Sequence, residues 1–445
     1  MKRRDFLKSA LFFSVLPIVK CSSNKTNNLK VVLLGFDGAN WQTLDPLFEK
    51  GKLQFLKKLR DNSAWASFKT YKPAKSNVIW TSIATGKHML KHGIMDFSYL
   101  RNNGIKVPYR KSKLKEPTIW EIINKYNKGS VVINWWVSHP PDKIEDIKIS
   151  DEFRNVLTKD DRFRIRYKNT VYPKNLFRLF TPFIQNNRDL QKVLKKIGVR
   201  DFVKDFQELY PQGNFKKIPV LSIYRTLIRQ DSLIEEISYY LFRKYSNVDL
   251  FFTYFRFPDI IQHFATHFID KCVKQELFKY WENNSMLNYS DLVIKKAYES
   301  VSDILLPAYE YMEKIIKNIF DMEKNKNTYF FILSDHGFNF YPGGYNHFNL
   351  PDEIPAPDGI FLLNGPNVRK GYYKDINVMD IVPNMLYLMD LPIGKRMDGK
   401  IQTDLFNFSR RIRYGTYRKN NLEKIRTNKD MDKRAMDELK SMGYI

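Results

Sequence analysis

The sequence predicts an α/β protein with a doubly wound, mostly parallel sheet flanked by helices. Three apolar runs rich in β-branched and aromatic residues, at 29–36, 248–255 and 328–333, indicate strands covered on both faces. Each run ends at a polar, Gly or Pro break, and helix-like segments separate the runs. This alternation is what crossover-connected parallel strands require, so it defines the fold class.

Composition indicates a folded protein with a preference for anionic partners. The 445 residues suit one large α/β domain with an insertion or two ordinary domains, and 43% hydrophobic content is ample for a core. Net charge is +26, from 74 Lys and Arg against 48 Asp and Glu. This excess favours phosphorylated substrates, nucleic acid or acidic lipid surfaces, although a genome-wide bias toward lysine explains it equally well. Nucleic acid is an unfavoured partner because no binding motif with defined spacing is present.

The remaining core elements follow the first strand in order. The pattern predicts a helix over 41–61, a helix beginning near residue 77 and a strand at 130–136. In the second half of the chain, it predicts strand 248–255, a long amphipathic helix over 291–322, strands 328–333 and 359–363, helix 379–389 and a peripheral helix within 431–443.

Residues 151–247 interrupt the alternation of strands and helices. Within them, residues 154–200 carry 13 Lys and Arg against three Asp. We predict that 151–247 form an inserted basic cap over the strand ends, the alternative being an ordinary solvated helical excursion. The catalytic core is then 29–150 with 248–410, and residues 411–445 form a polar helical C-terminal tail.

Residues 1–28 have the features of an export signal. Arg3 and Arg4, followed by Asp-Phe-Leu-Lys and a short apolar segment, match the twin-arginine pattern. Cys21 is a candidate for lipidation, although a lysine precedes it where a small residue is usual. We therefore expect an extracytoplasmic location, in the periplasm or cell envelope, with or without a lipid anchor; a basic amphipathic helix on a cytoplasmic protein is the alternative. For the other cysteine, Cys272, we expect a buried, inert thiol.

Three aspartates lie at the carboxyl ends of predicted strands. Asp37, Asp259 and Asp335 follow the runs 29–36, 248–255 and 328–333. Ligands of open α/β sheets bind at this edge, so the three carboxylates are expected to converge. They would repel one another unless a cation lies between them. Histidines accompany two of them, as Asp259-x3-His263 and Asp335-His336, which is ligand chemistry typical of zinc and its neighbours.

A nucleophile is predicted at Ser76. The segment Lys-Pro-Ala-Lys-Ser-Asn places Ser76 where a loop enters a helix, and backbone N–H groups at a helix N-terminus stabilise an anion. Serine needs a base or a metal to lower its pKa, and no histidine lies nearby in a triad-like pattern, so a metal is the better activator. Taken alone, Ser76 fits a simple helix N-cap better.

Together these residues resemble the alkaline phosphatase superfamily, and within it the type I phosphodiesterase/nucleotide pyrophosphatase branch. The resemblance spans residues 29–403 apart from 151–247. The matching motifs are Asp37-Gly38 after the first strand, Ser76 nine residues before Thr85-Gly86, His92-Gly93-Ile94, Asp259-x3-His263, Ser334-Asp335-His336-Gly337, and a late His347 in Gly-Tyr-Asn-His-Phe.

The resemblance implies two divalent metal ions, with zinc favoured and manganese or iron as alternatives. It assigns Asp37, Ser76, Asp335 and His336 to one metal, and Asp259, His263 and His347 to the other. It further implies that Ser76 attacks phosphorus to give a covalent phosphoserine, which water then hydrolyses. The N–H groups of the helix that begins there, including that of Asn77, would hold phosphoryl oxygens.

The chain departs from the branch at one position near the nucleophile. Nucleotide pyrophosphatases place an Asn three residues after His-Gly-Ile, where this chain has Phe97. With Lys75 and His139, Phe97 is a candidate for substrate binding. Sulfatase activity is disfavoured because the motif after Ser76 lacks the required Pro and Arg.

These features predict a two-metal hydrolase of phosphate esters, in the first place a phosphodiesterase. Its substrate would be a phosphorylated small molecule or a lipid-derived compound, with association at a membrane surface as a further expectation. A phosphomonoesterase and a phosphotransferase use the same groups and are the enzyme alternatives. A catalytically dead surface binding protein is the non-enzyme alternative, which the intact ligand set disfavours.

Export through the twin-arginine route is directly testable. Replacing Arg3 and Arg4 with Lys should trap the precursor in the cytoplasm, because the route that carries folded cargo depends on the arginine pair. Cell fractionation followed by immunoblotting measures this, with Lys25→Arg as a control outside the motif. Unchanged extracytoplasmic protein would contradict the twin-arginine assignment while leaving a general secretory route open.

Overall fold

The computed structural model describes residues 29–142, 147–157, 167–197, 219–265, 271–284, 288, 290–341, 344–347 and 356–419, together with residues 432, 433, 436, 437, 439 and 440. The predicted export signal, with Arg3, Arg4 and Cys21, lies outside the described residues, as do residues 158–166 and 198–218 of the predicted cap.

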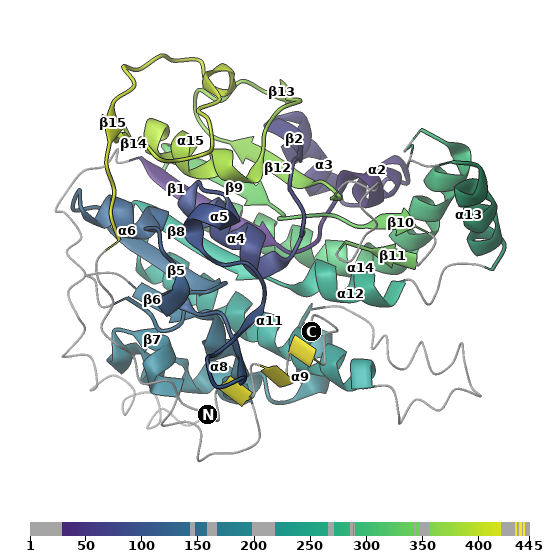
Figure 1. Ribbon diagram of the computed structural model, residues 1–445, viewed down its shortest axis with the longest axis horizontal. Coiled ribbons are helices and arrows are strands. Elements are labelled where there is room, and N and C mark those ends of the chain that lie inside the picture. Colours follow the sequence, from purple (N-terminus) through teal and green to yellow (C-terminus); the bar gives the residue numbers. More distant parts are fainter. Residues whose placement is uncertain are drawn as a thin grey trace, which may run out of the picture.

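A nine-stranded mixed sheet forms the centre of the molecule (Figure 1). Its strands are, in spatial order, β13 (Gly371–Tyr372), β2 (Ala64–Phe68), β12 (Gly359–Asn364), β9 (Thr328–Leu333), β1 (Lys30–Phe36), β8 (Leu250–Phe255), β5 (Ser130–Trp135), β6 (Ile147–Ser150) and β7 (Val171–Tyr172). Only β12 and β7 run antiparallel to their neighbours among these nine strands. The predicted fold class, a mostly parallel α/β sheet flanked by helices, is therefore confirmed.

The three strands that carry the predicted site are neighbours in the order β9-β1-β8. Both pairings are parallel, and the register places Gly35 of β1 opposite Leu333 of β9 and Tyr254 of β8. All three strands are fully buried, as their continuous apolar runs indicated. Their carboxyl ends thus lie at one edge of the sheet.

Alternate residues of β1 point into two hydrophobic clusters, one on each face of the sheet. Val32 and Leu34 belong to the first cluster, whereas Val31 and Leu33 belong to the second. The helices of the first cluster are α2 (Trp41–Glu49), α3 (Gln54–Asp61), α8 (Thr181–Asn186), α9 (Leu190–Ile197), α11 (Pro219–Lys244), α12 (Phe257–Ala265), α13 (Lys271–Asn283) and α14 (Leu292–Met322). Those of the second are α4 (Ser76–Thr85), α6 (Ile119–Asn124) and α15 (Ile381–Leu388). None of the described helices is long and apolar enough to cross a bilayer.

The single helix predicted over 41–61 is two helices, α2 and α3. The chain adopts positive φ angles at Gly51 (72°) and Leu53 (49°), which end α2 and turn the chain into α3. A left-handed residue cannot continue a right-handed helix, so the apolar periodicity on both sides of this turn misled the prediction.

Part of residues 151–247 belongs to the α/β body, and the cap over the strand ends stays a prediction because 158–166 and 198–218 lie outside the described residues. Strand β7 extends the sheet beyond β6, and Leu233, Ile234 and Ile237 of α11 are fully buried in the first hydrophobic cluster. Helix α11 also packs against β5, β8 and α14. Its apolar face is what makes it a helix that covers the sheet.

Three described residues of the predicted peripheral helix within 431–443 pack against the body. Met436 and Leu439 are 7% and 5% exposed and join the second hydrophobic cluster. Asp432 forms ion pairs with Arg101 at 3.0 Å and Arg110 at 3.1 Å. Both kinds of contact involve segments distant in sequence, which helical periodicity alone does not reveal.

The expectation of a buried thiol at Cys272 is wrong. Cys272 is exposed near the start of α13. Helix α13 packs mainly against α14, and residues such as Leu277 and Tyr280 form its buried side. Cys272 does not lie on this buried side of α13.

Candidate active site

The position of Ser76 is determined by helix α4 and by its close approach to β1. Ser76 is the first residue of α4, after Lys75 in an extended conformation. A Cβ atom on Gly35 would lie 2.7 Å from the Trp80 ring, so only glycine at this point of β1 lets α4 pack so closely. No described residue accepts a hydrogen bond from the N–H groups of Ser76 and Asn77, as is usual in the first turn of a helix. These N–H groups are free to hold an anion.

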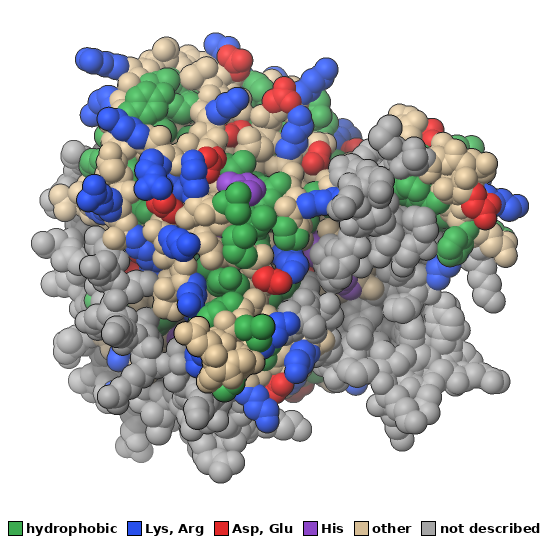
Figure 2. All heavy atoms as spheres, viewed as in Figure 1, with side chains coloured by type: hydrophobic (Ala, Val, Ile, Leu, Met, Phe, Trp, Pro, Cys, Tyr) green, Lys and Arg blue, Asp and Glu red, His purple; other side chains and the backbone are tan. Residues whose placement is uncertain are grey.

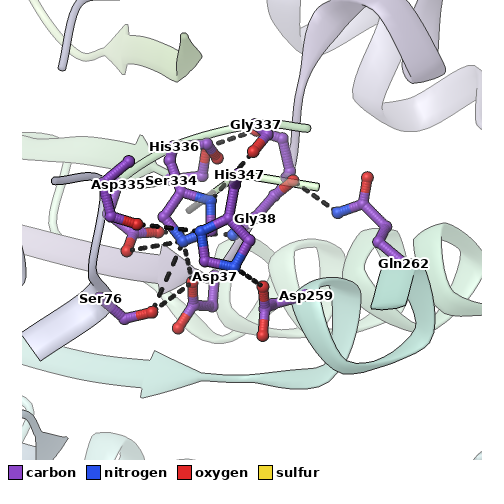
Figure 3. A network of polar contacts seen from close by, with 12 residues as sticks. Asp37, Gly38, Ser76, Asp259, Gln262, Ser334, Asp335, His336, Gly337 and His347 are labelled. Carbon is purple, nitrogen blue, oxygen red and sulfur yellow. Dashed lines mark hydrogen bonds and ion pairs between the residues drawn. The ribbon is translucent and has the colours of Figure 1, made fainter. Parts of the chain in front are cut away.

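Ser76 lies within one group of predicted metal ligands (Figure 3). Its Oγ atom is 3.4 Å from Asp37 Oδ1 and 3.5 Å from His336 Nε2. The same His336 Nε2 atom lies 3.3 Å from Asp37 Oδ1 and 3.3 Å from Asp335 Oδ2. All four residues are buried. The structure thus brings together the four residues that the resemblance assigned to the first metal.

Asp259, His263 and His347 form the second group. Asp259 Oδ1 is 3.4 Å from His263 Nε2 and 3.3 Å from His347 Nε2, and the two imidazole nitrogens are 3.2 Å apart. Asp259 also has a carboxylate oxygen within 4.8 Å of ligand atoms of Asp37 and His336, so the two groups adjoin. The His263 side chain is 23% exposed, whereas those of Asp259 and His347 are buried, so the site opens to solvent at His263.

The hydrogen bonds of two histidines fit metal binding. His347 Nδ1 lies 2.9 Å from the Ala74 carbonyl oxygen, and His336 Nδ1 lies 3.1 Å from that of Gly337. A carbonyl only accepts hydrogen bonds, so each Nδ1 carries the proton and each Nε2 presents its lone pair. These lone pairs face carboxylate oxygens across about 3.3 Å (Figure 3). Two electron-rich atoms in such contact need a cation between them, as at metal sites whose second ring nitrogen is hydrogen-bonded.

The electrostatics of the site lead to the same conclusion. Burial raises the pKa of Asp335 well above its usual range, and the nearby Asp37 and Asp259 carboxylates raise it further. Burial, together with His336, lowers the pKa of His347 well below its usual range. Neutral imidazoles and crowded carboxylates are the form of these groups that binds divalent metals. The nitrogen and oxygen donors present therefore fit a pair of zinc-like ions.

Sequence reasoning missed Tyr254, which supports Asp37. The Tyr254 hydroxyl donates a hydrogen bond to Asp37 Oδ2 and accepts one from Trp136 Nε1 at 2.7 Å. Tyr254 is the penultimate residue of β8, opposite Gly35 in the neighbouring strand. In the sequence, Tyr254 is one of several aromatic residues of a buried strand, so no signal singles it out. The donated bond orients the carboxylate.

Gln262 holds the turn that follows β1. Its side-chain Nε2 donates to the Gly38 carbonyl at 2.5 Å, and Figure 3 shows this bond beside the ligand groups. Gly38 has a φ of 74°, and a Cβ atom there would lie 2.9 Å from the Asp259 backbone. The glycine therefore permits the close approach of the two segments that carry Asp37 and Asp259.

The remaining predicted site residues are Lys75, Asn77, Phe97 and His139. Lys75 pairs with Asp96 at 2.7 Å, and the Asn77 side-chain amide donates to the Asp96 carbonyl at 2.5 Å. Phe97 is buried, with its ring 5.7 Å from that of Trp136. His139 Nδ1 lies 3.2 Å from Ser150 Oγ, at the end of β6. Burial lowers the pKa of His139 to about 3. Its contacts are structural ones, outside both ligand groups.

The fold and the two ligand groups define an α/β enzyme of the metal-dependent kind. The model of the type I phosphodiesterase/nucleotide pyrophosphatase family matches residues 31–387, and the chain belongs to this family. It is therefore a phosphoric ester hydrolase of the alkaline phosphatase superfamily, which is metal-dependent. A comparison with curated proteins found no match.

Several solved structures are similar to this chain at a low level. Murine ectonucleotide pyrophosphatase/phosphodiesterase 5 is 12% identical, with 85% of this chain and 100% of that chain covered and a TM-score of 0.45. A phosphonate monoester hydrolase from Silicibacter pomeroyi is 13% identical, with 84% of this chain and 76% of that chain covered and a TM-score of 0.44. Phosphonoacetate hydrolase from Sinorhizobium meliloti 1021 is 14% identical over 70% of this chain, which spans only 57% of that chain, with a TM-score of 0.37.

We predict that the active protein contains two divalent metal ions per chain. Elemental analysis of protein purified without chelator measures this content. Asp335→Ala or His336→Ala should lower it by about one ion, because each removes a ligand from a group that offers few others. His88→Gln, outside both groups, is the matched control and should leave the content unchanged. One ion or none in a fully active preparation would contradict the prediction.

Proposed function

We propose that this protein is a two-metal phosphodiesterase that acts through a covalent phosphoserine at Ser76. The observation that carries the proposal is the position of Ser76 Oγ, at the N-terminus of α4 and 3.4–3.5 Å from Asp37 and His336. A hydroxyl buried among prospective metal ligands is poorly explained as a helix cap, because its oxygen faces these ligands. It is well placed as a nucleophile.

The two steps of the reaction follow from the groups present. When bound by the two ligand groups, divalent ions would lower the pKa of the Ser76 hydroxyl and offset the charge on the phosphoryl oxygens. Ser76 Oγ then bonds to phosphorus as the bond to the departing alcohol oxygen breaks, and that oxygen leaves with a proton. The N–H groups of Ser76 and Asn77 hold an equatorial oxygen. Attack by water on phosphorus releases Ser76 and the phosphate monoester.

The charge near the nucleophile favours a diester over a monoester. A monoester dianion needs additional cationic or donor groups around the phosphoryl oxygens. Lys75, the nearest lysine in sequence, is engaged by Asp96. Phe97 replaces the amide that nucleotide-cleaving relatives are expected to use, and its ring is apolar. These surroundings suit a phosphoryl group that carries one organic substituent and one negative charge.

For the substrate we propose a phosphorylated small molecule or a lipid-derived phosphodiester, met outside the cytoplasm. Net charge is +26, and Figure 2 shows Lys and Arg side chains spread across the face in view, with fewer acidic ones. A positive surface attracts anionic substrates and acidic lipid headgroups over a range of about 10 Å at physiological salt.

Ser76→Ala should retain the fold and the metals but lose several orders of magnitude in turnover, because it removes one member of a unit that acts in concert. Steady-state kinetics on an aryl diester measure this. Ser82→Ala, in the same helix and hydrogen-bonded to Tyr71 and His92, controls for disturbance of α4. If Ser76→Ala kept more than about a tenth of the wild-type rate, Ser76 would not be the nucleophile.

The diester preference is tested by kcat/KM on matched p-nitrophenyl mono- and diesters. We expect the diester to be the better substrate, because Lys75 and Phe97 provide no additional positive charge for a dianion. Chelator-treated protein is the blank. A monoester preference above about tenfold, or about 1.4 kcal/mol in transition-state binding, would move the protein to the phosphatases.

A further inference from the structure

Exposed apolar side chains gather in one short segment of the chain, residues 90–105. This segment holds four of the eleven large hydrophobic side chains that are exposed among the described residues. The four are Leu90 at 70%, Met95 at 38%, Leu100 at 68% and Ile105 at 51%. In Figure 2, hydrophobic side chains form a band down the middle of the face in view, with Lys and Arg side chains on both sides. Single exposed hydrophobic residues are normal, but such a concentration marks a contact surface.

The tip of a β-hairpin presents two of these side chains. Strands β3 (Ser98–Leu100) and β4 (Lys106–Pro108) pair antiparallel, and the Gly104 N–H closes the turn by donating at 2.9 Å to the carbonyl oxygen three residues earlier. Gly104 has a φ of 75°, the left-handed conformation that glycine supplies in such turns. Leu100 and Ile105 flank this turn, and their exposure shows that both side chains point to solvent.

The base of the hairpin is held in place by the body of the protein. The Tyr109 N–H donates to the Phe97 carbonyl at 2.9 Å. Arg110 forms ion pairs with Glu152 at 3.0 Å and with Asp432 at 3.1 Å. A hairpin with a fixed base and an exposed apolar tip loses little conformational entropy when the tip docks on another surface.

The segment that contains the hairpin is strongly basic. Residues 98–115 include six Lys and Arg and no Asp or Glu. Of these cations, Lys106, Lys113 and Lys115 are exposed and form no ion pair with any described residue. Lys106 lies directly opposite Leu100 in the hairpin, so a cation and an apolar side chain share one face. Apolar side chains flanked by lysines are the composition that binds the interface of an acidic bilayer.

The hairpin begins beside the nucleophile. The Asp96 carboxylate pairs with Lys75 at 2.7 Å, and the Asp96 carbonyl accepts a hydrogen bond from the Asn77 side chain at 2.5 Å. Lys75 and Asn77 flank Ser76 in the sequence. Leu100 follows Asp96 by four residues, which span at most about 14 Å even when fully extended. The tip is thus close enough to the reacting oxygen for a surface that contacts the tip to present substrate to the site.

We propose that residues 90–105 dock on an acidic lipid surface, and that the protein takes its phosphodiester from that surface. The inference rests on the proposed function and narrows the substrate to a diester that carries a lipid group. Leu100 and Ile105 enter the boundary between headgroups and acyl chains, while the exposed lysines contact lipid phosphates. Exposed lysines beside aliphatic side chains suit an anionic lipid surface better than a protein partner, because protein interfaces are depleted in lysine.

Vesicle binding by the full-length protein tests this surface, with Cys21→Ser in every sample so that no lipid anchor contributes. The probe is a vesicle of equal parts phosphatidylglycerol and phosphatidylcholine, with phosphatidylcholine alone as the blank, and co-sedimentation gives the partition coefficient. Leu100→Ser combined with Ile105→Ser should lower partitioning about tenfold, because two apolar side chains no longer enter the lipid. Lys106→Gln should lower it about fivefold on the mixed vesicles alone. All three side chains are exposed, so these variants should keep their fold.

Leu292→Ser and Lys326→Gln are the matched controls. Leu292 is 68% exposed, as Leu100 is, and lies at the start of α14. Lys326 is an exposed lysine just before β9, at the opposite edge of the sheet from the site. Neither control should change the partitioning. Hairpin variants that bind as the wild type does, or controls that lose binding to the same extent, would overturn the assignment of the surface.

Turnover separates this inference from the proposed function. The kcat/KM on the phospholipids of the mixed vesicles, divided by that on soluble bis(p-nitrophenyl) phosphate, should fall about tenfold in the Leu100 and Ile105 variant and stay constant in Leu292→Ser. Soluble turnover without hydrolysis of the vesicle phospholipids would overturn the lipid source of the substrate. No turnover of either diester by the wild type would refute the proposed function, whereas partitioning would still decide whether residues 90–105 dock on lipid.

Sedimentation velocity without vesicles tests the competing occupant, a second copy of the chain. We expect a concentration-independent sedimentation coefficient for the wild type. Self-association that the Leu100 and Ile105 variant abolishes would assign the surface to a protein contact and overturn the lipid assignment.

Discussion

Three buried carboxylates, forced together by the sheet, are the constraint on which the rest of the site depends. The parallel register of β9, β1 and β8 brings Asp335, Asp37 and Asp259 to one edge. Their mutual repulsion and their burial raise the pKa of Asp335. No described lysine or arginine forms an ion pair with Asp37 or Asp335. Divalent cations are the simplest way to stabilise this arrangement at neutral pH.

The surroundings of the carboxylates prepare the site for such cations. The carbonyl oxygens of Ala74 and Gly337 bind the Nδ1 protons of His347 and His336, which leaves both Nε2 lone pairs directed at the carboxylates. Tyr254 orients Asp37 through a hydrogen bond. These partners lie on different elements, so folding itself sets the directions of the ligands before any ion binds. The large apolar cores on both faces of the sheet provide the stability that offsets the cost of holding these ligands in place.

The predicted metal ligands do lie together in the structure, and the sequence could indicate this because local motifs mark them. Asp37, Asp259 and Asp335 follow apolar strands, and strand ends converge whatever the details of the helices. The supporting groups could not be predicted in this way. Tyr254 reads as one more aromatic residue of a buried strand, and the Ala74 carbonyl has no side-chain signature at all.

The failures elsewhere have the same physical origin. The apolar face of α11 decides where that helix packs, and the composition of residues 151–247 did not indicate it. The split of 41–61 depends on two positive φ angles, one of them at Leu53, a residue type that rarely adopts them. The ion pair between Arg101 and Asp432 joins residues more than 300 positions apart. Such contacts are set by tertiary packing, which helical and strand periodicity does not reveal.

The net charge of the site connects the proposed metal binding with the proposed preference for a phosphodiester. Under the proposed function, two divalent ions held by three carboxylates would leave one net positive charge in the site while Ser76 keeps its proton. A phosphodiester monoanion neutralises that charge. A monoester dianion would leave an unmatched negative charge in a buried place, where it is costly. Lys75 could have supplied the missing cation, but Asp96 already neutralises it. The ion pair between Lys75 and Asp96 thus supports the proposed preference for a substrate with one organic substituent on each side of phosphorus.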